Sequence, residues 1–221
     1  MAPNEVTTRE RIRDAALLRF ATQGYARTHL KDIAAAVGVT TPLITHHFGS
    51  KNALRAECDR HVAALIKEQK TAGIDNHPDA DLLQRIRAVY VDTPILEYLA
   101  RALSEQSPQV DELVDLIVED AVEYTERAVE QGMIRPHPRL REQVIALTIW
   151  QLGAMSLHHH VARLTGVDLL GGDEESLLRW TSLLSEILTH GVIEPDYYDR
   201  LTRVLDPSQD PIEHSHHGGT T

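Results

Sequence analysis

The sequence predicts an all-α fold in which a small N-terminal three-helix unit precedes a larger helical body. Apolar residues recur at the three- and four-residue spacing of amphipathic helices along most of the chain, and the alternation that marks strands is nearly absent. Gly and Pro interrupt these segments at positions typical of helix ends. The expected parts are the unit over residues 1–52, the body over 53–206, and a polar tail over 207–221, rich in His and Gly, which we expect to be disordered.

Capping and stop signals define four helices at the N-terminus. Thr7 and Glu10 have the spacing of a capping box, in which each side chain accepts a hydrogen bond from the other residue's backbone. Gly24 and Gly38 are the expected stops, since glycine readily adopts the backbone conformations that end a helix. Ser50 is expected to cap the fourth helix. The predicted ranges are about 7–24, 30–37, 41–48 and 50–70.

Helical patterns continue beyond a break at 71–79, where Gly73, Asn76 and Pro78 occur close together. We take this break as a candidate domain boundary that follows the fourth helix. The predicted helices of the body are about 80–92, 94–106, 109–131, 138–164, 174–190 and 195–205.

Two of the late helices carry more apolar surface than one core contact requires. Residues 144–157 contain no charged side chain, which predicts a buried helix. Apolar residues of the helix at 174–190 spread over roughly 220° of the helical wheel, whereas one core-facing surface needs about 100°. The second face needs a partner, so we expect a homodimer through the helices at 138–164 and 174–190. The alternative is a helix buried at the centre of a single chain.

Composition is ordinary for a soluble globular protein, with 42% hydrophobic and 25% charged residues. The single cysteine, Cys58, excludes a disulfide framework. The N-terminus lacks the basic-then-apolar order of a signal peptide, and no apolar run approaches the roughly 20 residues of a membrane helix. We therefore expect a cytoplasmic protein with no membrane contact.

The distribution of charge favours a nucleic-acid partner despite the net charge of −11. Residues 1–70 contain every lysine and carry a formal charge of +4, whereas residues 71–221 carry −15. Such a difference between segments is typical of a DNA-binding head on an acidic body.

Ala34, Gly38 and Ile44 have the spacing of a helix-turn-helix. The small residue lets the two helices approach, the glycine makes the turn, and the apolar residue packs the second helix onto the first. The second helix is then free to enter the DNA major groove, which is about 12 Å wide.

The stretch from Thr8 to Leu54 resembles the DNA-binding domain of the TetR (tetracycline-repressor) family. Two positions depart from the family pattern: Thr45 stands where the recognition helix usually has Tyr, and His29 stands where Ser or Thr usually opens the second helix. We expect Thr28 to replace His29 as a cap or phosphate contact. The residues that match the family, with its spacing, are Ile12, Ala15, Ala16, Phe20, Gly24, Tyr25, Asp32, Ile33, Ala34, Ala36, Val37, Gly38, Val39, His47, Phe48, Ser50, Lys51 and Leu54.

This resemblance implies a set of DNA contacts. Lys31 near the start of the second helix and Lys51 at the start of the fourth are placed for phosphates, because exposed N–H groups at helix N-termini attract anions. His47 either touches a phosphate or only packs. The recognition helix has no Arg or Asn, so indirect readout of DNA shape is expected to contribute. The expected DNA-binding residues are Thr28, Lys31, Thr40, Thr41, Pro42, Thr45, His46, His47 and Lys51.

Amphipathic rings in the body are candidates for an effector pocket, with core packing as the alternative. The sequence carries no Gly-rich phosphate loop or nucleophile elbow, so we expect neither an enzyme nor a cofactor. The run at 158–160 of three His does not predict a metal site, because consecutive helical residues point about 100° apart. The candidate ligand-binding residues are Tyr90, Tyr98, Tyr124, Trp150 and His158.

The functional hypothesis is a homodimeric repressor that a small hydrophobic or aromatic effector releases from a palindromic DNA operator. We expect the helices at about 80–131 to enclose the effector, and the fourth helix to transmit its binding to the DNA-binding unit. The alternative is a ligand-independent, constitutive DNA-binding or architectural dimer. A closed apolar cavity in the body would favour the first hypothesis.

Overall fold

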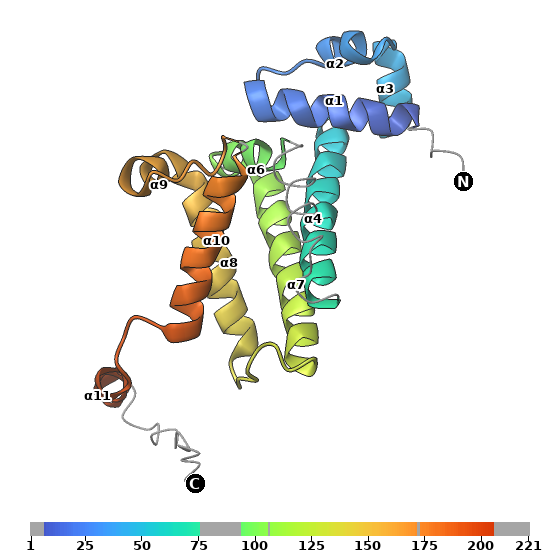
Figure 1. Ribbon diagram of the computed structural model, residues 1–221. Coiled ribbons are helices and arrows are strands. Elements are labelled where there is room, and N and C mark those ends of the chain that lie inside the picture. The colour runs from blue at the N-terminus through green and yellow to red at the C-terminus, as the bar shows by residue number, and fades with distance from the viewer. Residues whose placement is uncertain (1–6, 76–93, 106, 172, 206–221) are drawn as a thin grey trace. The chain divides into compact units, whose positions relative to one another are not determined.

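The computed structural model describes residues 7–75, 94–105, 107–171 and 173–205, and these residues form helices joined by short connections (Figure 1). The all-α prediction is confirmed. Within the described ranges, no helix combines the length and the apolar character needed to cross a membrane. The predicted helix at 80–92, which includes Tyr90, lies outside the residues that the structure describes. The predicted tail at 207–221 lies outside them as well. The helices are α1 (Thr8–Gln23), α2 (Leu30–Val37), α3 (Thr41–Phe48), α4 (Lys51–Asp75), α6 (Ile95–Leu103), α7 (Pro108–Glu130), α8 (Leu140–Ser156), α9 (His158–Thr165), α10 (Glu174–His190) and α11 (Pro195–Leu205).

The predicted caps form at the N-terminal helices. The Thr7 hydroxyl accepts a 3.2 Å hydrogen bond from the backbone N–H of Glu10, whose carboxylate accepts one of 2.7 Å from the backbone N–H of Thr7. The Ser50 hydroxyl accepts one of 3.1 Å from the backbone N–H of Ala53. Gly38 ends α2 in the left-handed conformation, with φ +70°. These contacts satisfy backbone groups that a helix end otherwise leaves unpaired.

Helix α4 is longer than predicted, because it continues beyond residue 70 to Asp75. Gly73 does not end it, since one glycine inside a helix costs only about 1 kcal/mol. Contacts with α7 hold this end of α4: the Asp75 carboxylate lies 3.5 Å from the Arg127 guanidinium and accepts a 3.4 Å hydrogen bond from Gln131. Tertiary contacts therefore extend the helix past its local stop signal.

The predicted helix at 138–164 is two helices, α8 and α9, which meet at Leu157. The backbone of Leu157 has φ −103° and ψ 20°, so it leaves the α-helical range. Its N–H still donates to the Gly153 carbonyl at 2.9 Å, and its carbonyl accepts from the His160 N–H at 2.8 Å. Because both helices keep their end groups bonded through this residue, the change of direction needs no Gly or Pro at the junction.

The prediction that residues 144–157 are buried is wrong for the single chain. Within α8, all of which the structure describes, only Val144 is buried. Ile149 and Trp150 are 50% and 49% exposed. In α10, Leu183 and Leu188 are 42% and 51% exposed.

The described residues fall into two compact units, one that ends at Leu177 and one that begins at Leu178. In the first unit, α1 packs against α6 and α4 packs along α7. One cluster of buried apolar side chains extends from the N-terminal helices into α6 and α7, with Ile12, Leu54 and Ile95 fully buried. Cys58 belongs to this cluster, and burial raises the pKa of its thiol well above the usual range. The helices α1–α3, which we call the head, thus share a core with the rest of the unit.

Candidate nucleic-acid interface

The helix-turn-helix is formed by α2 and α3. The Ala34 carbonyl accepts a 3.0 Å hydrogen bond from the backbone N–H of Val39, which closes the turn around Gly38. Ala34 and Ile44 are 4% and 1% exposed, so both helices bury the face on which the predicted spacing placed them. Phe48 is buried at the end of α3, and the Arg9 guanidinium lies 5.0 Å from its ring centre. These contacts fix α3 on the head.

The opposite face of α3 and the residue before it carry polar side chains. Thr40, Pro42, Thr45 and His46 are exposed, whereas Thr41 and His47 are half-buried. The rings of the two histidines contact edge to face, with their centres 5.7 Å apart. A helix fixed on one face and polar on the other can place side chains in the DNA major groove.

Thr28 requires a correction. It is fully buried, and its hydroxyl donates to the Gly24 carbonyl at 2.9 Å and lies 3.3 Å from the Arg19 carbonyl. It neither caps α2 nor reaches a phosphate in this arrangement, and the N-cap residue of α2, His29, makes no side-chain capping hydrogen bond. The short Thr side chain instead bonds to carbonyls at the end of α1 and in the turn that follows.

The two lysines predicted to bind phosphates have different surroundings. Lys31 is exposed in the first turn of α2. Lys51 is half-buried: its ammonium donates a 2.5 Å hydrogen bond to the Tyr25 carbonyl and lies 4.0 Å from the centre of the Tyr25 ring. Burial lowers the pKa of Lys51. Because an ammonium has three donors, this contact leaves Lys51 able to bind a phosphate as well.

Arg11 supports the turn of the helix-turn-helix and was missed by sequence reasoning. Its guanidinium donates a 2.8 Å hydrogen bond to the Val37 carbonyl at the end of α2. The two residues are 26 positions apart, and no local pattern links them. The first turn of α1 therefore contributes to the orientation of α2 and α3.

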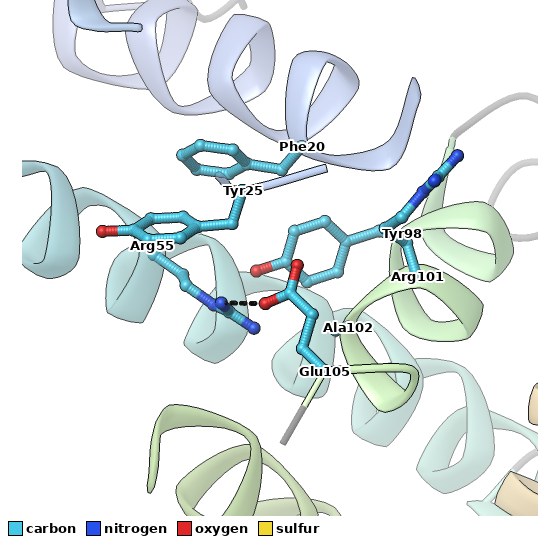
Figure 2. A pocket seen from close by; sticks show the side chains of 7 residues that line it. All are labelled: Phe20, Tyr25, Arg55, Tyr98, Arg101, Ala102 and Glu105. Atoms are coloured by element: carbon cyan, nitrogen blue, oxygen red, sulfur yellow. Dashed lines mark hydrogen bonds and ion pairs between the residues drawn. The ribbon is translucent and has the colours of Figure 1, made fainter. Parts of the chain in front are cut away.

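A buried polar cluster joins the head to α4 and α6, and sequence reasoning did not anticipate it (Figure 2). The Arg55 side chain of α4 is 4% exposed, and its guanidinium donates a 2.5 Å hydrogen bond to the Glu105 carboxylate. Burial opposes the charged form of Arg55, but the hydrogen bond and charge of Glu105 outweigh it and raise the pKa of the guanidinium. The Tyr25 ring covers Arg55 with its centre 5.0 Å away.

The cluster encloses a cavity of about 10 Å³, lined by side chains of the head, α4 and the end of α6. A cavity needs about 10–15 Å³ to hold one water, so this one is too small for an organic effector. The residues around this cavity connect the head with α4 and the end of α6, and we call this junction the joint. The residues that line the cavity are Phe20, Tyr25, Arg55, Tyr98, Arg101, Ala102 and Glu105.

The four described candidates for an effector pocket lie at separate places. Tyr98 is buried in the joint, whereas Tyr124 is half-buried and packs where α7 meets α8. Trp150 is about half exposed on α8, and His158 contacts His159 at the start of α9, with the two rings tilted and their centres 4.0 Å apart. Burial lowers the pKa of His158. Local spacing could not show this separation, because it depends on how the helices pack.

Comparison with known proteins agrees with this geometry. The family described as "Bacterial regulatory proteins, tetR family" matches residues 12–58, and the family described as "Tetracyclin repressor-like, C-terminal domain" matches residues 91–194. The regulatory protein RaaS of Mycobacterium tuberculosis, of the helix-turn-helix type, is 32% identical over 150 residues, which span 67% of this chain and 70% of RaaS. The chain belongs to the TetR family of DNA-binding transcriptional repressors. Its members are regulators and not enzymes.

Two further relatives agree with this assignment. The protein of Escherichia coli K12 described as "Probable acrEF/envCD operon repressor" is 28% identical over 131 residues, which span 58% of this chain and 54% of that protein. The structure of SmeT, the repressor of a multidrug efflux pump of Stenotrophomonas maltophilia, aligns with a TM-score of 0.51 and 22% identity over 78% of this chain and 86% of SmeT. SmeT therefore shares the fold of this TetR-family chain.

Proposed function

We propose that this protein is a homodimeric repressor that leaves a palindromic operator when a small hydrophobic or aromatic effector binds to the body. The observation that carries the DNA-binding part is the recognition helix α3, whose Ile44 and Phe48 are buried while Thr45 and His46 are exposed. Threonine can bond to base edges or pack its methyl group on thymine. Repression is supported by the E. coli relative, whose description names it as a repressor.

We assign base contacts and phosphate contacts to different residues of the head. Thr45 and His46 are exposed on α3 and are proposed to face the bases, together with Thr40, Thr41 and Pro42 at its start. Phosphate contacts fall to the ammonium groups of two lysines and to a ring N–H of one histidine, because contacts with the DNA backbone add affinity without reading sequence. The proposed phosphate-binding residues are Lys31, Lys51 and His47.

A dimer explains the apolar side chains that a single chain leaves exposed. Ile149 and Trp150 on α8, and Leu183 and Leu188 on α10, are each 42% exposed or more. Stable interfaces bury roughly 1,200–2,000 Å² in total, and contiguous exposed apolar surface marks such contacts. A two-fold dimer presents two recognition helices, so the operator is proposed to be palindromic.

The effector is proposed to bind in the body, within the part that matches the C-terminal family domain. Tyr124 supports an amphipathic wall there, since its ring is half-buried between α7 and α8 and burial raises the pKa of its hydroxyl. An effector must prefer the released state by about 5.5 kcal/mol to change the bound fraction from 99:1 to 1:99. The competing proposal remains a constitutive DNA-binding dimer without an effector.

Selection of bound duplexes from random DNA tests the operator, and the expected result is a palindrome with two similar half-sites. Enrichment of a single asymmetric site would contradict the dimeric proposal. Effectors are then sought by calorimetry with a library of small aromatic and hydrophobic compounds. Linkage requires that operator DNA weaken effector binding by the same factor as effector weakens operator binding. A compound bound equally well with and without operator leaves the constitutive dimer as the better description.

A further inference from the structure

We propose that the end of α6 and the turn that follows it act as a clamp that orients the head, with Arg101 and Glu105 as positioning residues for the spacing of the operator half-sites. This inference rests on the proposed function, because it presumes two heads on one palindrome. The clamp residues lie about one helical turn apart, and they contact different partners: Arg101 contacts α1, and Glu105 contacts α4.

Arg101 holds the C-terminal end of α1. Its guanidinium donates two 3.3 Å hydrogen bonds, from Nε to the Ala21 carbonyl and from an Nη to the Thr22 carbonyl. The last four carbonyls of a helix lack partners within the helix, and positive charge is favourable at this end. In Figure 2, Arg101 extends toward α1 and away from Glu105. One side chain of α6 thus contacts the first helix of the head through its backbone.

Glu105 forms an ion pair with Arg55, a buried cation of α4. The two side chains are 2.5 Å apart, and the Arg55 side chain is only 4% exposed. A second carboxylate, Asp59, lies farther from Arg55, at 3.8 Å. Loss of Glu105 would leave the buried Arg55 with only the more distant Asp59 as a counter-charge, so this contact resists opening. Tyr25, which lies between α1 and α2, covers the same guanidinium and extends the contact to the head.

The clamp adds to the attachments that the head already has through the shared apolar core. The head continues covalently into α4 through residues 49–50, and it is held by the end of α6 through α1 and Tyr25. A rotation of α1–α3 about the start of α4 has to break the Arg101 contacts and displace Tyr25 from Arg55. Besides the shared core, the orientation of the recognition helix relative to the body consequently depends on two side chains that lie outside the helix-turn-helix.

The number of base pairs between the two operator half-sites is the DNA property whose effect on binding depends on the orientation of the heads. Each added base pair moves a half-site by about 3.4 Å and rotates it by roughly 35°, because 10–10.5 base pairs make one turn. A dimer with rigidly held heads binds one half-site spacing tightly and binds spacings one base pair shorter or longer much more weakly. A dimer whose heads can rotate loses little affinity when a half-site is shifted, while each head still binds an isolated half-site as before.

The test uses the full-length chain and duplexes that carry the selected operator with the spacer shortened or lengthened by one base pair, together with a single half-site. The variants are Glu105→Gln, which keeps the shape and removes the charge, and Arg101→Ala, which removes the contact with α1. Glu119→Gln is the matched control, because Glu119 accepts hydrogen bonds from Arg141 on the body surface and does not contact the head. Thermal unfolding establishes that each variant folds.

We expect both clamp variants to lower the preference for the selected spacing over its neighbours by about five-fold or more, with unchanged affinity for the half-site. The control keeps the wild-type preference. An unchanged preference in folded Glu105→Gln and Arg101→Ala overturns the proposal, and so does an equal loss of affinity on every duplex, since that is the signature of a merely structural role. If the wild-type protein binds all spacings with equal affinity, that result instead contradicts the two-headed dimer, independently of the results for the variants.

Discussion

Tyr98 on α6 donates a 2.5 Å hydrogen bond to the carboxylate of Asp59 on α4, and both side chains are almost completely buried. Burial raises the pKa of Asp59, while the hydrogen bond from Tyr98 and the charge of Arg55 oppose that rise. The phenol thus helps to keep a carboxylate charged beside Arg55. This contact lies next to the proposed clamp and stabilises the same junction of α4 and α6.

Tyr98→Phe should destabilise the protein by about 1–3 kcal/mol at neutral pH, because it removes the hydrogen bond and leaves Asp59 buried without that donor. A raised pKa in the folded state means that the contribution of Asp59 to stability is present below its unfolded pKa and is lost as pH rises through the folded pKa. Without Tyr98 that pKa rises further. Urea unfolding at several pH values should therefore show a deficit that is largest near pH 7 and shrinks below about pH 4. A deficit independent of pH would mean that Tyr98 acts by packing alone.

Adjacent residues of α3 should have separable effects. Ile44→Ala removes a buried side chain that is 1% exposed, which should cost about 2–5 kcal/mol of stability and weaken binding to every sequence. Thr45→Ala changes an exposed position, so stability should change by less than about 0.5 kcal/mol. Binding to single-base variants of the operator should show an altered preference for Thr45→Ala. If its preference and affinity both stay at wild-type values, Thr45 does not face the bases.

The two lysines of the head should differ in their dependence on salt. Lys31→Ala should reduce the slope of log affinity against log salt by about 0.9, as expected for the loss of one phosphate contact, without changing thermal stability. Lys51→Ala should reduce the slope and also lower stability, because Lys51 bonds to the Tyr25 carbonyl. Fluorescence anisotropy at several salt concentrations measures the slope. A wild-type slope removes the lysine concerned from the interface.

Leu183→Glu in α10 should separate the dimer. The residue is 42% exposed in the single chain, so the substitution should leave the fold intact, but in an interface it buries an unpaired charge at a cost of several kcal/mol. Light scattering should show a folded monomer that no longer prefers a palindrome over a half-site. Leu18→Glu is the matched control, since Leu18 is 53% exposed on α1 and lies outside the helices proposed for the interface. A Leu183→Glu protein that remains a dimer would place the interface elsewhere.

Much of the head could be predicted from the sequence because its signals are local. The capping box at Thr7, the left-handed Gly38 and the cap at Ser50 each involve residues within four positions of one another, and the structure contains all three. The buried positions Ala34 and Ile44 follow from the same short-range geometry. Local chemistry determines these features before tertiary packing adds anything.

The features that sequence reasoning missed depend on distant partners. Arg101 meets the Ala21 carbonyl across 80 positions, and Arg55 meets Glu105 across 50. No periodicity connects such residues, and each belongs to a type that is usually exposed on a helix. The error at Thr28 has the same origin: its hydroxyl is taken by the Gly24 carbonyl, which only the turn after α1 brings close.

The burial of Cys58 has a practical consequence for spectroscopy. Thiol-directed labels react with exposed thiolates, and the only cysteine of the chain is fully buried with a thiol whose pKa is raised. Ala36→Cys, on the exposed surface of α2, would therefore introduce the one reactive thiol. Each protomer of the proposed dimer would then carry a single spin label on its head. The distance between the two labels, measured by pulsed electron resonance, would report how far apart the heads stand with and without DNA.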